Sequence, residues 1–200
     1  MKLLLFSDLH CDADAARRLV HRAESADVVV GAGDFASVRR GIDVCINVLK
    51  AIRKPAVLVP GNNETEDELR AACRAWPSAH VLHGAAVEIA GLQFFGLGGG
   101  VPVTPFGAWS FDLTEEEAAQ KLRSCPAGCV LVSHSPPKGA VDVSSSGKSF
   151  GSVAVLEAIT SKQPTLVVCG HIHESAGRSE LVGLTPVVNA GPAGIDWSLT

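Results

Sequence analysis

Short apolar runs alternate along the chain with stretches in which the apolar residues follow a helical period. The runs, rich in valine and leucine, predict buried strands over residues 2–7, 27–30, 56–59, 128–133 and 165–168. Between them, apolar residues at positions such as 38, 42, 45, 49 and 52 repeat every three to four residues. Helices are therefore predicted over residues 12–24, 38–52, 64–74, 114–123 and 151–161.

Two segments depart from this alternation. In residues 86–97, Ala90-Gly91 separates two apolar runs, which is typical of a hairpin. Residues 179–182 and 186–188 predict a second, closing hairpin. The repeated alternation indicates an α/β sheet covered by helices, and the hairpins imply mixed strand directions. A length of 200 residues, of which 46% are hydrophobic, suits one sizeable core, so we expect a single domain over residues 1–200.

Composition and charge narrow the classes of function. The net charge is only −4 and no basic run is present, which argues against an extended nucleic-acid surface. No apolar run approaches the length of a membrane span, and the short apolar start is better explained by a strand than by a signal peptide. The six cysteines have no paired two-residue spacing and are expected to be reduced thiols. We therefore expect a cytoplasmic protein without a membrane partner.

Polar residues that can bind metal ions follow the carboxyl ends of the predicted strands. They are Asp8 and His10, Asp34, Asn62, His134, and finally His171 and His173. Because ligands bind beyond the carboxyl ends of the strands in open α/β sheets, we expect these side chains to converge. Carboxylate, imidazole and amide donors without a thiolate suit Mn, Fe or Zn. So many donors exceed the needs of one tetrahedral metal and predict two ions that share a carboxylate and clamp a phosphoryl group.

These motifs also carry a family resemblance. In order, they are Asp8-x-His10, Gly33-Asp34, Gly61-Asn62, Ser133-His134 and Gly170-His171-x-His173. From residue 8 to residue 192 the chain resembles the calcineurin-like metallophosphoesterases, and its last two motifs look most similar to small phosphodiesterase-like members. The resemblance implies a four-layer α/β/β/α sandwich with mixed sheets.

The resemblance further implies a dinuclear metal site. It assigns Asp8, His10 and His173 to one ion, Asn62, His134 and His171 to the other, and Asp34 to both. Manganese is the expected metal, with iron, zinc and nickel as alternatives, and a hydroxide that bridges the metals is the expected nucleophile. The implied function is a phosphoesterase, preferably a phosphodiesterase that acts on nucleotides or small phosphate esters. A nucleotide phosphomonoesterase and a non-catalytic, metal-binding interaction module on the same fold are the alternatives.

Asn63 departs from the family pattern. The family often has a histidine at this position, which protonates or stabilises the leaving group, so the expected catalytic residues are Asp34, Asn62 and, in a role that the departure puts in question, Asn63. An asparagine donates hydrogen bonds but does not titrate near neutral pH. We therefore expect either reduced activity toward poor leaving groups or another acid, such as a metal-bound water. Because some diesterase-like members of the family also lack this histidine, the resemblance favours diesters over alkyl monoesters.

A few further residues are candidates for supporting roles. Glu64 and Glu174 are next to expected ligands in the sequence, where they either orient those ligands or are simply solvated. Trp109, Phe106 and Phe111 are expected to pack in the core or at an edge or, if they are exposed beside the metals, to determine substrate specificity. Lys148 and the neighbouring serines lie in an expected loop and could contact a substrate phosphate.

Overall fold

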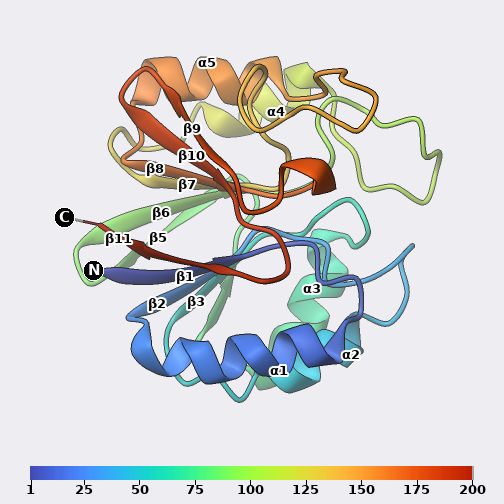
Figure 1. The fold of residues 1–200 in the computed structure, drawn as a ribbon, viewed down its shortest axis with the longest axis vertical. Coiled ribbons are helices and arrows are strands. Elements are labelled where there is room, and N and C mark those ends of the chain that lie inside the picture. Colours follow the sequence, from blue (N-terminus) through green and yellow to red (C-terminus); the bar gives the residue numbers. More distant parts are fainter. Residues whose placement is uncertain (200) are drawn as a thin grey trace.

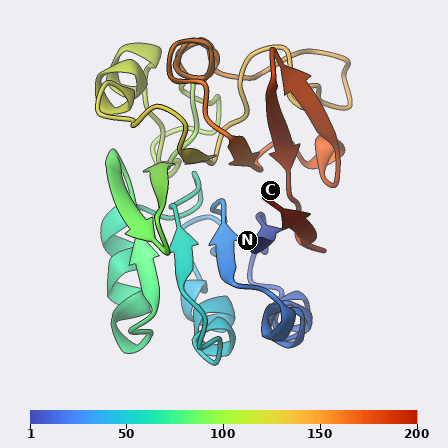
Figure 2. The ribbon, with the colours of Figure 1, turned by 90° about the vertical axis from the view of Figure 1, so that its left-hand side faces the viewer.

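Two β-sheets stacked face to face form the middle of the structure, and helices cover both outer faces (Figure 1). This computed structural model describes residues 1–199. A view turned by 90° shows one set of helices below the lower sheet and another set above the upper sheet (Figure 2). The four-layer α/β/β/α architecture expected from the sequence is confirmed.

The first sheet has five strands in the order β11-β1-β2-β3-β4. Their bounds are Ile195–Ser198 for β11, Lys2–Phe6 for β1, Val28–Gly31 for β2, Ala56–Leu58 for β3 and Ala79–Val81 for β4. Strands β1 to β4 are parallel, and β11 pairs antiparallel with β1. The helices that cover this sheet are α1 (Ala13–Arg22), α2 (Ile42–Leu49) and α3 (Glu66–Ala72), with short 3-10 turns at Ala23–Ser25 and Cys73–Ala75.

The second sheet has six strands in the order β5-β6-β7-β8-β10-β9. Their bounds are Ala85–Ile89 for β5, Leu92–Leu97 for β6, Val130–Ser133 for β7, Leu166–Cys169 for β8, Thr185–Asn189 for β10 and Ser179–Val182 for β9. The four inner strands are parallel, while β5 and β9 run antiparallel at the edges. Helices α4 (Glu115–Leu122) and α5 (Val153–Lys162) pack on the outer face, and a 3-10 turn spans His173–Ser175.

A continuous apolar layer lies between the sheets. It includes Leu3, Leu5, Val28, Val30, Val57, Val130, Val132, Leu166 and Val168. Because the inner strands are covered by this layer on one face and by helices on the other, they are buried on both faces and appear in the sequence as unbroken apolar runs. This double burial explains why the runs predicted these strands.

Polar caps define where several helices begin. Asp12 accepts hydrogen bonds from the backbone of Asp14 and Ala15 and thereby starts α1. The expected capping box of Thr114 and Glu117 is present at the start of α4. A second box, formed by Thr65 and Glu68, starts α3 at residue 66, which leaves residue 64 outside the helix.

The structure also departs from the sequence predictions at one helix start and at two strands. The helix expected from residue 38 begins at residue 42, because Val38, Arg39 and Gly41 have φ angles of 48°, 62° and 73°, which a right-handed helix does not allow. Strands β4 and β11 were not predicted. Each is a short strand at a sheet edge, and neither has a long apolar run.

None of the helices in residues 1–199 has the length and apolar character needed to cross a bilayer.

Candidate metal centre

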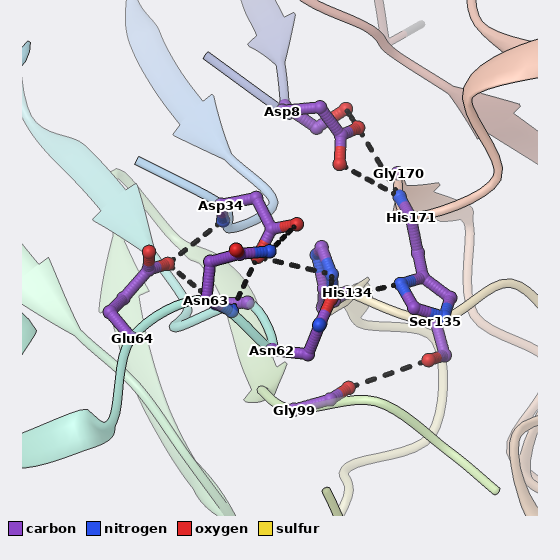
Figure 3. Close-up of polar contacts among 12 residues, drawn as sticks. Asp8, Asp34, Asn62, Asn63, Glu64, Gly99, His134, Ser135, Gly170 and His171 are labelled. Atoms are coloured by element: carbon purple, nitrogen blue, oxygen red, sulfur yellow. Dashed lines mark hydrogen bonds and ion pairs between the residues drawn. The ribbon is translucent and has the colours of Figure 1, made fainter. Parts of the chain in front are cut away.

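The predicted ligands lie together at the edge of the sandwich where parallel strands from both sheets end. Asp8 follows β1, Asp34 follows β2 and Asn62 follows β3 in the first sheet. His134 follows β7, and His171 and His173 follow β8 in the second sheet. Figure 3 shows Asp8, Asp34, Asn62, His134 and His171 around a shared centre. The convergence expected from the strand ends is therefore present.

One group of donors consists of Asp8, His10, Asp34 and His173. One ligand atom from each residue lies within 4.8 Å of every other, so these four side chains could hold a metal ion. The Nε2 atoms of His10 and His173 are 3.1 Å apart. His10 Nε2 lies 3.5 Å from Asp34 Oδ2, and His173 Nε2 lies 3.6 Å from Asp8 Oδ1.

A second group of donors surrounds the side-chain oxygen of Asn62. This Oδ1 atom lies 3.2 Å from His134 Nε2 and 3.1 Å from His171 Nδ1. His134 Nε2 is also 3.5 Å from Asp34 Oδ1. Asp34 therefore presents Oδ2 to the first group and Oδ1 to the second, and its carboxylate lies between the two.

Backbone carbonyls orient two of the imidazoles. His134 Nδ1 lies 2.7 Å from the oxygen of Ala32, and His10 Nδ1 lies 3.2 Å from that of Ala36. When each Nδ1–H donates to its carbonyl, the lone pair of Nε2 faces the other donors. This tautomer is the one that binds a metal through Nε2.

Several of these residues have an unusual backbone conformation. The φ angles of Asp8, His10, Asp34 and His171 are 57°, 43°, 59° and 66°. Residues other than glycine seldom have positive φ, and such residues cost about 1–3 kcal/mol each and cluster at functional sites. The strained residues lie in the turns that follow the strands, and these turns direct the side chains toward one another.

Two glycines allow the backbone to approach the carboxylates closely. A Cβ atom at Gly61 would overlap the Asp34 carboxylate, and one at Gly170 would overlap that of Asp8. The missing side chain at Gly170 also lets the neighbouring backbone N–H of His171 donate to Asp8 Oδ1 at 3.0 Å. Lack of space for a side chain thus explains why a glycine precedes Asn62 and His171 in these two motifs.

The electrostatics of the donors suit a cation. Burial would raise the pKa of Asp8, but hydrogen bonding to His173 and the charge of His134 lower that pKa to about 2. Burial and the neighbouring His134 lower the pKa of His171 to about 3. Near neutral pH, Asp8 is therefore an anion and His171 a neutral base, which are the forms that bind metals.

Glu64 holds the loops that carry two of the donors. Its fully buried carboxylate accepts backbone hydrogen bonds from Asp34 at 2.8 Å, Ala36 at 2.9 Å and Gly61 at 2.7 Å. Burial, together with the nearby charge of Asp34, raises the pKa of Glu64 to about 7. Glu64 thus orients the donor loops, whereas Glu174 is exposed at the rim of the site.

Comparison with known proteins identifies the family. A model of the calcineurin-like phosphoesterase superfamily domain matches residues 1–198. The chain belongs to this superfamily. The matched residues include the cluster of Asp and His donors, so the chain is a member of the metallophosphoesterase family that has the donors for a metal centre.

Two curated relatives are similar to part of this metallophosphoesterase chain. The human metallophosphoesterase domain-containing protein 1 is 31% identical over 145 residues, which is 70% of this chain and 41% of that protein. The UPF0046 protein T07D4.2 of Caenorhabditis elegans is 31% identical over 104 residues, which is 50% of this chain and 25% of that protein. The matches therefore span less than half the length of either relative.

Solved structures have the same fold. The TT1561 protein of Thermus thermophilus has a TM-score of 0.77 at 20% identity, over 96% of this chain and 90% of that one. A dimetal phosphatase from Danio rerio has a TM-score of 0.62 at 15% identity, over 94% of this chain and 86% of that one. At these identities the likeness shows the metallophosphoesterase fold alone.

Asn63, which occupies the position where the family often has a histidine, is turned toward Asp34. Its Nδ2 donates to Asp34 Oδ2 at 2.8 Å (Figure 3). Its Oδ1 accepts from the backbone N–H of Val38 at 2.7 Å. The residue is buried, with 7% of its surface exposed. In this metallophosphoesterase, both polar ends of the side chain are therefore engaged within the protein.

A cavity of about 460 Å³ opens beside the donors. It is lined by His10, Asp34, Asn62, His171 and His173. Of the three aromatic residues predicted either to pack or to contact substrate, Phe106 and Trp109 line the cavity and Phe111 does not. Among the loop residues weighed as phosphate contacts, Ser144 lines this cavity, and Lys148 is not part of the lining. The donors therefore face an open cavity.

Proposed function

We propose that the chain is a dinuclear metal-dependent phosphodiesterase. Asp8, His10 and His173 hold one metal ion, Asn62, His134 and His171 hold the second, and Asp34 binds both. The position of the Asp34 carboxylate carries this proposal, because its Oδ2 and Oδ1 atoms each lie 3.5 Å from a histidine of a different donor group.

The donor set fits two divalent ions of intermediate softness. Carboxylates, imidazoles and one amide oxygen are ligands that Mn, Fe, Zn and Ni accept, and we propose manganese as the native metal. Metal ions held there would polarise a phosphoryl group and make a water molecule more acidic. The chain itself supplies aligned donors, because the carbonyls of Ala32 and Ala36 fix two imidazoles and Glu64 fixes the donor loops.

The surroundings of Asn63 support a preference among substrates. Its side-chain amide donates a hydrogen bond to Asp34 and accepts one from the backbone N–H of Val38. Asn63 therefore orients the metal ligand Asp34 and does not deliver a proton to the leaving group. General acid catalysis is typically worth about 10²–10⁴-fold, and esters with good leaving groups depend on it least. We therefore favour small phosphodiesters, including nucleotide diesters, over alkyl monoesters.

We also propose that the protein works in the cytoplasm. Support comes from its six cysteines, which have no paired two-residue spacing and form no disulfide in the structure. Reduced thiols are typical of that compartment.

The proposal is tested with the purified full chain after treatment with a chelator. Adding Mn²⁺ should restore hydrolysis of bis(4-nitrophenyl) phosphate, with a lower rate on 4-nitrophenyl phosphate. Asp34→Asn should lose bound manganese and at least about 100-fold in activity, because it removes the charge that both donor groups share. Asp43→Asn, an exposed carboxylate on α2, is the matched control and should behave as the wild type.

Two outcomes would overturn the proposal. A faster rate on the monoester would favour the phosphomonoesterase. Full binding of manganese without turnover of any ester would favour the non-catalytic module.

A further inference from the structure

Four apolar side chains form one wall of the cavity beside the donors. We call Val103, Phe106, Trp109 and Phe150 the apolar wall, since all four line this cavity. Val103, Phe106 and Phe150 are 58%, 51% and 47% exposed. The rings of Phe106 and Trp109 stack with centroids 5.7 Å apart and an interplanar angle of 14°. Exposed apolar side chains gathered in a concave site mark a place where a ligand binds.

The apolar wall and the donor groups share one space. The cavity that Phe106 and Trp109 line is also lined by His10, Asp34 and His171. Its volume of about 460 Å³ lies in the usual range for small-molecule sites, about 300–1,000 Å³. A molecule whose phosphate lies at the donors must therefore extend along the apolar wall.

The charges around the cavity limit what this extension can be. No lysine or arginine within residues 1–199 lines the cavity, and the exposed Glu174 adds a negative charge at its rim. Arg39 lies close by, but its guanidinium is engaged by both carboxylate oxygens of Glu68 at 2.8 Å and donates to the carbonyl of Trp109. The described lining thus offers no free cation for a second phosphate, so the extension carries no second phosphate.

The segment that carries three residues of the wall is tied to a proposed metal ligand. Asn62 Nδ2 donates to Ser110 Oγ at 3.1 Å, and Asn62 O accepts from the backbone of Phe111 at 2.9 Å. Asp112 accepts from the backbone and the hydroxyl of Thr104 at 2.9 and 2.7 Å. These bonds place Phe106 and Trp109 at a fixed position relative to the donors.

The loop that carries Phe150 is built in a similar way. Asp142 Oδ2 accepts from the backbone of Gly139 at 3.0 Å and of Gly151 at 2.9 Å, and the Asp142 carbonyl accepts from Phe150 N at 3.0 Å. In Figure 1 this loop and the loop of residues 98–114 project on the same side of the molecule. The apolar wall is therefore organised before a ligand binds.

We propose that the apolar wall binds a flat aromatic group of the phosphate ester, with Trp109 as a specificity-determining residue. This inference rests on the proposed phosphodiesterase function and names its substrate class, a diester that carries one phosphate and an uncharged aromatic substituent. Ring surfaces stack on tryptophan and phenylalanine without the need for hydrogen bonds, so an aryl or nucleobase ring is suited to this wall.

Three esters with one common leaving group isolate this contact. Phenyl, cyclohexyl and methyl 4-nitrophenyl phosphate all release 4-nitrophenolate and differ only in the group that stays on phosphorus. Because the three esters differ in intrinsic reactivity, each is compared between the wild type and the variants. Trp109→Leu should lower the ratio of kcat/KM for the phenyl ester to that for the methyl ester about tenfold, mostly through KM, the range expected for one lost stacking contact.

Two further variants separate stacking from general damage. Trp109→Phe keeps a flat ring and should retain most of the phenyl preference. Leu184→Ala removes a side chain that is 98% exposed in the turn between β9 and β10, away from the cavity, and should leave all three rates unchanged. If Trp109→Phe and Trp109→Leu lower the ratio equally, the flat ring is irrelevant and the inference is wrong.

A binding measurement provides a second readout. Phenylphosphonate and methylphosphonate contain no ester bond, so their affinities for the manganese-loaded protein can be measured by calorimetry without turnover. We expect tighter binding of phenylphosphonate in the wild type and loss of this difference in Trp109→Leu.

The outcomes distinguish this inference from the function on which it rests. Hydrolysis of the methyl ester without a phenyl preference, or an equal preference for the cyclohexyl ester, overturns the aromatic subsite and leaves the phosphodiesterase intact. Failure to hydrolyse all three esters after manganese is added overturns the proposed function itself.

Discussion

Asn63 contacts both oxygens of the Asp34 carboxylate. Its backbone N–H donates to Asp34 Oδ1 at 2.9 Å, and its side-chain amide donates to Oδ2 at 2.8 Å. Because each of these oxygens faces a different donor group, one residue fixes the orientation of the carboxylate toward both groups. The departure from the family motif therefore lies in direct contact with the residue on which the proposed centre depends.

Removal of the Asn63 side chain should weaken the centre and the fold together. Asn63→Ala leaves Asp34 Oδ2 and the Val38 N–H without these partners, which costs about 1–3 kcal/mol of unfolding free energy. Loss of a residue that orients a ligand should weaken manganese binding about 10–100-fold. Urea unfolding and metal titration measure the two effects. Asn47→Ala, at an exposed position on α2, is the control, and equal losses in both variants would contradict the orienting role.

A histidine at position 63 should add a function that the chain lacks. Asn63 borders the cavity, so an imidazole there would lie beside the leaving group of a bound ester. Asn63→His should raise kcat for alkyl diesters, by at most about 10²–10⁴-fold, and change kcat for 4-nitrophenyl esters little, because nitrophenolate needs no proton. Steady-state kinetics on both kinds of ester provide the test. An unchanged kcat for the alkyl diester would contradict this explanation of the departure.

The buried carboxylate of Glu64 should be important for stability. Glu64→Gln keeps the size of the side chain but replaces one accepting oxygen with an NH₂ group, which faces backbone N–H donors of Asp34, Ala36 or Gly61. Hydrogen bonds to charged groups are worth about 1.5–3 kcal/mol, so we expect a loss of about that size in chemical denaturation at a pH well above the pKa of Glu64 of about 7, where its carboxylate is ionised. Glu24→Gln, on the exposed turn after α1, should be neutral, and a Glu64→Gln protein as stable as the wild type would refute this role.

His83 should make stability depend on pH. Its Nδ1 accepts a hydrogen bond from the backbone of Gly98 at 3.1 Å, and burial lowers its pKa from 6.5 to about 4. The unfolded chain therefore binds a proton more readily, and the free energy of unfolding falls as the pH drops from 6.5 toward 4. The slope due to this one group is at most about 1.4 kcal/mol per pH unit.

Comparison of variants isolates this effect from that of other titrating groups. His83→Asn retains an acceptor without a titrating ring and should lose less stability than the wild type between pH 7 and pH 5. His21→Asn alters a histidine that is 85% exposed and should follow the wild type. Parallel curves for wild type and His83→Asn would contradict the assignment.

The convergence of these polar side chains was predictable from the sequence because their position follows from the fold. Parallel strands such as β1, β2 and β3 end at one edge of the sheet, so a polar residue after each apolar run must lie near the others. The orientation of the Asn63 side chain toward Asp34 could not be predicted, because it depends on a hydrogen bond from the Val38 N–H. This N–H is available because residues 38 and 39 have a left-handed backbone conformation. That same backbone made the predicted helix start four residues too early.

The apolar wall was only half predictable. Phe106 and Trp109 were recognised as either packing or specificity residues, but the sequence does not say on which side of the loop they lie. Their position depends on distant hydrogen bonds, such as the one between Asn62 and Ser110. Phe150, from a loop about 40 residues further along the chain, joins them only in the folded protein.

Electron paramagnetic resonance of the manganese-loaded full chain tests the shared role of Asp34 most directly. We predict two Mn²⁺ ions per chain with the multiline spectrum of an exchange-coupled pair, because one carboxylate links the two donor groups. Asp34→Asn should abolish the coupling. One ion per chain, or two ions with the spectrum of isolated Mn²⁺, would contradict the proposed centre.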